Sequence, residues 1–228
     1  MNKTILVLCL TALASAPAAA QIVRDDSNYP TYDPGSDARN GYTAHDLMDA
    51  KIQGLYGKTI GDIDDLVIGP GGQLRRLLVD VNEGLLGTGG QRLAIEWTDV
   101  VPGPRKDGEV QYFIAPVSKD NVQQFGIFTN RKPAVQGKGR EWRAEELIGD
   151  YVSLEDAPDY GSVTDLVFNR QGKLLSIALV PDITRGYPGL RFYNRFPAGG
   201  NGWDPGDDFV VLPYTTKDVK KIIPNTGS

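Results

Sequence analysis

The sequence predicts a mainly β fold made of two small antiparallel β-barrels in tandem, with short helices. A 14-residue stretch from Gly61 to Leu74 recurs in similar form from Gly161 to Leu174, 100 positions later. Each copy has the pattern of a strand, a glycine-containing tight turn and a second strand. Its apolar residues are mostly two positions apart, which is the period of a strand with one buried face. A repeat of this kind predicts two copies of one supersecondary unit.

The first twenty residues are expected to be a secretory signal peptide. They contain basic Lys3, an apolar run over 5–16 and small residues before a cut expected between Ala20 and Gln21. The apolar run is too short to span a bilayer with margin. The cut would leave 208 residues and discard Cys9, the only cysteine. We therefore expect a periplasmic protein, with full secretion as the alternative.

The charge of the chain argues against nucleic-acid binding. The formal charge of −5 becomes −6 once Lys3 is removed, whereas general nucleic-acid binders present basic surfaces. No later stretch is apolar for long enough to form a membrane helix. We expect a product that is soluble after export and has no transmembrane segment.

The remaining chain is expected to divide into a tail, two domains and a linker. The tail, 21–42, is rich in Pro, Asp, Asn and Gly and should be flexible. The first domain covers 43–129 and the linker 130–142, which is rich in Lys, Arg, Gly and Pro. The second domain covers 143–224 and includes an aromatic insertion at 182–208.

The repeat extends without a gap from Ala44 to Val79. After it, we match the strand Arg92–Trp97 with 209–214, so that Trp97 lies opposite Tyr214. This match requires an insertion of 17 residues in the second copy.

The first half carries a series of motifs in a fixed order. They are Ala-x-Asp-Leu from Ala44, Gly-x-Ile-x-Asp-Leu-Val from Gly61, Gly-Leu-Leu-Gly from Gly84, and Leu-Ala-Ile-Glu-Trp ending at Trp97. This order resembles the PRC-barrel family, named for a domain shared by the H subunit of photosynthetic reaction centres and a ribosome-maturation factor. The resemblance covers Thr43 to about Phe125 well and 143–222 less well, departing at the turn 169–172. It implies a strongly bent antiparallel β-barrel used for docking, with no catalytic residues to carry over.

Asp65 and Asp165 recur at equivalent positions, each as an acid on an otherwise apolar row. A structural role explains them more economically than catalysis. We expect each carboxylate to accept hydrogen bonds from backbone N–H groups of a neighbouring loop, holding a barrel corner. The other positions expected to be structural are Gly61, Gly161, Gly72, Gly172, Trp97 and Tyr214.

The aromatic insertion is the candidate binding surface. Tyr, Trp and Arg are the residue types that dominate binding hot spots, and the insertion is rich in them. An alternative is that the segment covers its own barrel or seals the contact with the first barrel. The candidate binding residues are Arg185, Tyr187, Arg191, Phe192, Tyr193, Arg195, Phe196 and Trp203.

Catalytic chemistry has little support in the sequence. The only histidine is His45, and no Gly-x-Ser-x-Gly motif is present. We therefore expect no enzyme activity, no catalytic residues, no metal and no cofactor. The alternative is a carboxylate-dependent hydrolase of the envelope. Its candidate acids are Asp62, Asp64, Glu145, Glu146, Asp204, Asp207 and Asp208.

These observations predict an exported, non-enzymatic binding or assembly module of the cell envelope. It would dock an unidentified protein or envelope component through the second barrel. A weaker alternative is that the second barrel only stabilises the first.

Overall fold

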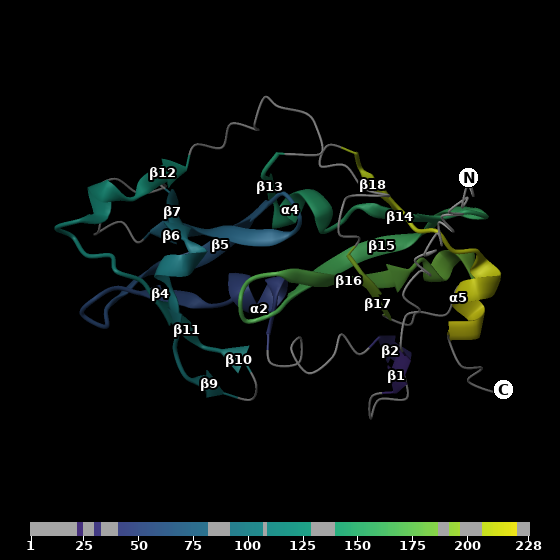
Figure 1. The fold of residues 1–228 in the computed structure, drawn as a ribbon, viewed down its shortest axis with the longest axis horizontal. Coiled ribbons are helices and arrows are strands. Elements are labelled where there is room, and N and C mark those ends of the chain that lie inside the picture. Colours follow the sequence, from purple (N-terminus) through teal and green to yellow (C-terminus); the bar gives the residue numbers. More distant parts are fainter. Residues whose placement is uncertain are drawn as a thin grey trace, which may run out of the picture.

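The computed structural model describes residues 22–24, 30–32, 41–81, 92–106, 109–128, 140–186, 192–196 and 207–222. These residues form mainly β structure with a few short helices, which confirms the predicted fold class. Figure 1 shows one large sheet from the first half at the left and another from the second half at the right. Short elements of both halves lie between the two sheets.

The first sheet has eight strands, in the order β12-β7-β6-β5-β4-β11-β8, with β13 pairing β5 beside that path. All neighbours are antiparallel except β11 and β4, which are parallel. The strands are β4 (Lys51–Gln53), β5 (Thr59–Gly69), β6 (Gln73–Val81), β7 (Arg92–Glu96), β8 (Val101–Pro102), β11 (Tyr112–Ile114), β12 (Gly126–Phe128) and β13 (Trp142–Arg143).

The second sheet has six strands, in the order β17-β16-β15-β14-β18, with β3 pairing β15 beside that path. Here β14 and β18 are the parallel pair. The strands are β3 (Tyr42–Thr43), β14 (Tyr151–Leu154), β15 (Ala157–Phe168), β16 (Leu174–Pro181), β17 (Phe192–Arg195) and β18 (Phe209–Val211).

In the described part of the chain, six short helices connect or cover the sheets. Helix α2 begins at a capping box, because the Thr43 hydroxyl accepts the Asp46 N–H at 3.0 Å and the Asp46 carboxylate accepts the Thr43 N–H at 3.3 Å. The helices are α2 (Ala44–Met48), α4 (Ala144–Leu147), α5 (Thr216–Ile222), η1 (Trp97–Asp99), η2 (Val122–Gln124) and η3 (Ile183–Arg185).

The segment expected to be a tail contains two short strands. Strands β1 (Ile22–Arg24) and β2 (Pro30–Tyr32) pair antiparallel, and β2 lies against β17. The flexibility of the segment 21–42 stays a prediction, although these strands pair and Tyr42 is buried. A further hairpin joins β9 (Arg105–Lys106) to β10 (Glu109–Val110).

The two long hairpins, β5·β6 and β15·β16, have the same register at an offset of 100. Each has a bulge just before its aspartate, Asp65 or Asp165. The bulge breaks the alternation of faces. Leu66, which simple alternation places on the outer face with Asp62, is therefore buried.

The strands after these hairpins correct the sequence match. Strand β17 pairs β16 as β7 pairs β6, and β18 pairs β14 in parallel as β11 pairs β4. The match of 92–97 with 209–214 is therefore wrong. Strands that pair with equivalent partners are equivalent, so β17 corresponds to β7, and Phe196 corresponds to Trp97. The supposed insertion at 182–208 contains β17. The offset falls from 100 in the hairpins to 97 at β18, so the second copy needs no long insertion.

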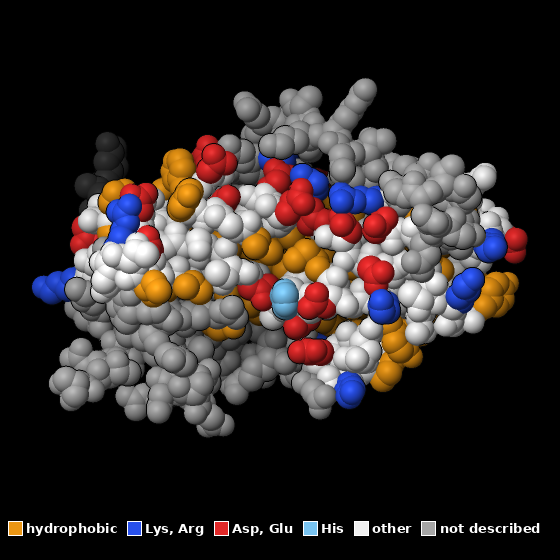
Figure 2. Space-filling view, turned by 180° about the vertical axis from the view of Figure 1, so that it is seen from behind, with side chains coloured by type: hydrophobic (Ala, Val, Ile, Leu, Met, Phe, Trp, Pro, Cys, Tyr) orange, Lys and Arg blue, Asp and Glu red, His pale blue; other side chains and the backbone are white. Residues whose placement is uncertain are grey.

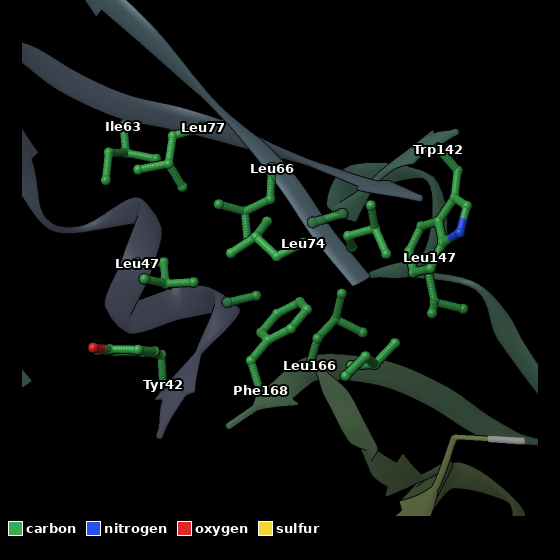
Figure 3. Close-up of a cluster of buried hydrophobic side chains, with 14 of the residues drawn as sticks. Tyr42, Leu47, Ile63, Leu66, Leu74, Leu77, Trp142, Leu147, Leu166 and Phe168 are labelled. Carbon is green, nitrogen blue, oxygen red and sulfur yellow. The ribbon is translucent and has the colours of Figure 1, made fainter. Parts of the chain in front are cut away.

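The two halves share one hydrophobic core. Figure 3 shows its centre, where Leu66 and Leu74 of the first half lie near Leu166 and Phe168 of the second. All four side chains are almost fully buried. The division into two domains stays a prediction, and most of the expected linker lies outside the described residues.

Candidate functional site

The two halves exchange short strands. Strand β3 of the first half pairs with the end of β15, with Thr43 opposite Val167. Strand β13 of the second half pairs with the end of β5, with Arg143 opposite Val67. The two contacts are related by the offset of 100. We use the term junction for residues 42–47, 65–74, 142–147 and 165–174, which form these and the following contacts.

Each bulge aspartate binds the first turn of a helix in the other half. Asp65 Oδ1 accepts the N–H of Glu145 at 3.4 Å and of its own neighbour Leu66 at 2.8 Å. Asp165 Oδ1 accepts the N–H of His45 at 3.2 Å and of Leu166 at 2.8 Å. The partner in each case is thus a helix of the other half, in place of the neighbouring loop expected from the sequence.

Burial strongly affects both carboxyl groups. It raises the pKa of Asp65 to about 6, against the lowering effect of the Leu66 and Glu145 N–H groups and of nearby Arg143. Asp65 Oδ2 is buried without a hydrogen bond, and the Arg143 Nε lies 3.8 Å from it. Burial also raises the pKa of Asp165, against the N–H groups of Leu166 and His45. The junction therefore contains two carboxyl groups that protonate more readily than exposed ones.

The turns of the two long hairpins pack against each other. The Leu74 N–H donates to Gly172 O and the Leu174 N–H donates to Gly72 O, both at 2.7 Å. Between these bonds, Gln73 and Lys173 form an isolated antiparallel bridge. Gln73 and Lys173 are equivalent residues of the two halves, 100 positions apart, so their contact marks an approximate two-fold axis of the junction.

The glycines of these turns leave room for the opposite half. Both Gly72 and Gly172 have φ of +77°, which favours glycine. A Cβ added at Gly172 would lie 2.6 Å from Nε1 of Trp97 and 3.1 Å from the Cβ of Leu74. A Cβ at Gly72 would lie 3.1 Å from the Cβ of Leu174. Gly61 and Gly161 have another reason to be glycine, because a Cβ would lie 2.1 Å and 2.2 Å from a carbonyl oxygen of the paired strand.

Two aromatic pairs flank the turns. Trp97 contacts Tyr42 edge-on at 5.5 Å between ring centroids, and Phe196 contacts Trp142 at 6.0 Å. Trp97 and Phe196 are half-buried and pack against the shared core. Tyr214, expected to be the counterpart of Trp97, also packs against the core, but elsewhere. Phe196 thus packs against the shared core, and the binding role predicted for it stays a prediction.

The other predicted binding residues are only partly described. Arg185 is half-exposed and its guanidinium lies 2.9 Å from an Asp159 carboxylate oxygen. Tyr193 is half-buried in β17. The side chains of Phe192 and Arg195, and the whole of Tyr187, Arg191 and Trp203, lie outside what the structure describes.

The structure reveals an exposed apolar face that the sequence analysis missed. Tyr151, Phe209 and Val211 are 62%, 47% and 41% exposed. Tyr151 lies directly opposite Phe209 in the parallel pair β14·β18, while the alternate residue Val210 is buried. These three side chains therefore share the outer face of the strand pair, and we call them the apolar row. In the sequence, Phe209 and Val211 stand on either side of Val210. Because all three residues are apolar, the sequence does not show which of them face the core.

The equivalent face of the first sheet is different. Lys51 occupies the position of Tyr151, and its Nζ lies 2.7 Å from an Asp62 carboxylate oxygen. Strand β8 pairs with the outer edge of β11. The outer edge of β18 is paired with none of the named strands in the described part of the chain. The two outer faces thus differ in charge at the position of Lys51 and Tyr151, while Tyr112 and Ile114 take the positions of Phe209 and Val211.

The described acids proposed for catalysis are largely paired with bases. Asp64 lies 2.9 Å from Arg92, and Glu145 pairs with Arg143. Although burial raises the pKa of Glu146, its hydrogen bonds from Arg140 and the Arg143 N–H lower that pKa below its usual value. The hydrolase alternative stays a prediction.

The histidine has no metal-binding surroundings in the described residues. Figure 2 shows His45 among acidic side chains near the middle of one face. Its exposed imidazole lies 3.2 Å from the Asp49 carboxylate. Among the described residues, no group of three His, Cys, Asp or Glu side chains could hold a metal ion. Asp207 and Asp208 are exposed, and Asp204 lies outside the described residues.

Comparison with known proteins finds a family match in the first half. Residues 39–120 match the family model of the PRC-barrel domain. The match confirms the resemblance for that half and does not extend to the second. No match was found among the curated proteins. In the described part of the chain, no helix has the length and apolar character needed to cross a membrane.

Proposed function

Starting from the PRC-barrel domain at residues 39–120, we propose that this protein is an exported, non-enzymatic binding or assembly module of the cell envelope. The proposed export rests on the signal-peptide pattern of Met1–Ala20. The second half is proposed to be a second barrel in tandem, which docks a protein or another envelope component.

The apolar row is the observation that carries the docking proposal. Burying exposed apolar surface is favourable in association, and aromatic side chains are frequent hot spots. Tyr151 lies opposite Phe209, whereas in the first half the position of Tyr151 is taken by Lys51, which pairs with Asp62, and the position of Phe209 by Tyr112. A purely structural second barrel has no need for this difference, whereas a binding surface does.

The test is photo-crosslinking in intact cells followed by binding measurements. A photoreactive residue at Tyr151 should capture a partner, and the same residue at Lys51 should not. Replacing Tyr151 and Phe209 by Ser should then weaken binding of the purified partner by about tenfold or more, since hot-spot truncations cost about 2 kcal/mol or more.

The matched control is Ile114→Ser, at the position of the first sheet that is equivalent to Val211. It removes a 40% exposed apolar side chain and should leave binding unchanged. A test of the aromatic segment combines Arg191→Ala with Trp203→Ala, which we expect to reduce capture without unfolding the protein. Equal loss with Ile114→Ser, or full binding by the Tyr151 and Phe209 variant, would contradict docking through this face.

A further inference from the structure

We infer that the junction can form between two copies of the chain as well as within one copy. The first half of each copy would then pack against the second half of the other, giving a closed dimer with exchanged halves. This inference does not depend on the proposed function, because it concerns the contacts that complete the fold.

The junction contacts are reciprocal. The pairs Thr43–Val167 and Val67–Arg143, and the bonds from His45 N–H to Asp165 and from Glu145 N–H to Asp65, are the same contacts at an offset of 100. The turn-to-turn bonds repeat this relation. Such a junction has the geometry of a two-fold dimer interface formed inside one chain.

Each half needs the other to bury its core. Leu66, Leu74, Leu166 and Leu174 are each at most 3% exposed, and all belong to the single shared cluster. A half that separates would expose these side chains to water, which is unfavourable. An opened chain therefore closes again on a second half, whether that half belongs to the same copy or to another.

The junction contacts are the same whether the second half comes from the same copy or from another copy. They are all noncovalent, and in the sequence the two halves are joined by the segment 129–139. Closure within one copy is favoured by an effective concentration on the order of millimolar for a short linker. Exchange should therefore appear when unfolded protein refolds at high concentration, and it should persist because reversal requires the shared core to open.

A disulfide can report which copy supplies each half. Gln73 and Lys173 face each other between two reciprocal hydrogen bonds, and both are half-buried. Such a non-hydrogen-bonded pair has Cα atoms about 4.5 Å apart, which suits a disulfide. The mature chain, as expected from the sequence, has no cysteine to compete.

The experiment unfolds the mature Gln73→Cys, Lys173→Cys variant in denaturant with reductant, then refolds it over a wide range of concentration. Native mass is measured by light scattering, and denaturing gels without reductant are run after oxidation. At low concentration we expect monomer with an internal disulfide. At high concentration we expect a species of twice the mass whose chains remain covalently joined on the gel.

Two results would overturn the inference. One is monomer at every concentration up to the solubility limit, with the wild-type chain behaving in the same way. The other is a dimer by mass whose disulfides are all internal, because association would then use another surface. Gln73→Cys alone is the control and should give no covalent dimer. A covalent dimer of this variant would mean that the first halves of two copies meet. That result would contradict exchange between a first half and a second half.

Discussion

Asp65 and Asp165 show how one residue type links the two halves. Each carboxylate lies at a bulge, is buried, and accepts a backbone N–H from a helix of the opposite half. A buried carboxylate held in this way fixes the position of that helix, because leaving its hydrogen bonds unmade costs free energy.

Replacing Asp165 by Ala should lower the free energy of unfolding by about 1–3 kcal/mol. The Leu166 and His45 N–H groups would lose their acceptor, and Asp165→Asn should lose less because the amide oxygen can still accept. Urea denaturation followed by fluorescence measures the effect. Asp182→Ala is the control, since Asp182 accepts the Thr184 N–H on the exposed surface. An unchanged melt with lost binding would contradict the structural role.

The raised pKa of Asp65 predicts that stability depends on pH. Its folded-state pKa of about 6 lies above the unfolded value of 3.8, so the folded state binds more protons between these values. This contribution to stability is therefore complete below about pH 4 and is lost as pH rises through about 6, by up to about 3 kcal/mol.

Denaturation midpoints measured from about pH 4 to about pH 7 test this dependence. Asp65→Asn should flatten the curve in part, and the remainder should follow Asp165, whose pKa is also raised. A profile identical to that of the wild type would show that Asp65 does not titrate in this window.

The sequence identified these aspartates but not their partners. An acid on an apolar row is visible as a local pattern, so Asp65 could be selected. The helix that reaches it is 80 residues away along the chain, and no local pattern encodes that approach. The sequence analysis also missed the equivalence of Trp97 and Phe196. The two residues are of different types, and they are 99 positions apart, whereas the hairpins are offset by 100.

At the level of elements, the hairpin turns are the best place to test the junction. Gly172→Ala should be more destabilising than Gly186→Ala, although both glycines have φ of +77°. The backbone strain is similar, but only at Gly172 would the added Cβ meet Trp97 and Leu74, while Gly186 has open space around it. We expect an additional loss of about 1–3 kcal/mol.

Thermal unfolding of the two variants measures this difference. Equal destabilisation by Gly172→Ala and Gly186→Ala would mean that Trp97 and Leu74 can move away from the added Cβ without loss of stability. Gly71→Ala is a second control, because Gly71 shares the φ of +77° and only the end of the Lys173 side chain comes near.

The elements themselves were predictable to different degrees. The long hairpins β5·β6 and β15·β16 follow from strand period and turn residues, and their common register agrees with the offset found in the sequence. The strand β18 was assigned to the wrong place because Val210 and Leu212 carry the same apolar alternation as Leu93 and Ile95. Three-residue strands contain too little pattern to specify a pairing partner.

For the whole molecule, the shared core predicts that the first half cannot fold alone. A chain that ends at residue 128 would lose Trp142, Leu147, Leu166 and Phe168 from the cluster in Figure 3. We expect it to lack a cooperative thermal transition and to bind a dye specific for exposed apolar surface. Circular dichroism and dye fluorescence, compared with the full chain, measure this. A sharp transition near that of the full chain would contradict the dependence.

The arrangement of the halves could not be predicted from the sequence. Two similar units separated by a linker suggest barrels that close separately, and nothing local indicates that β3 joins β15 or that β13 joins β5. These pairings bring together strands far apart in the chain, where only the three-dimensional packing decides the outcome.

The place of β13 also has a consequence for the order of synthesis. The ribosome makes the chain from its N-terminus, so β5 is complete long before residues 142–143 exist to pair with its end. The Asp65 carboxylate likewise waits for the N–H of Glu145. The nascent first half therefore lacks these contacts until residues 142–145 have been made, so the junction joins segments that are synthesised at well-separated times.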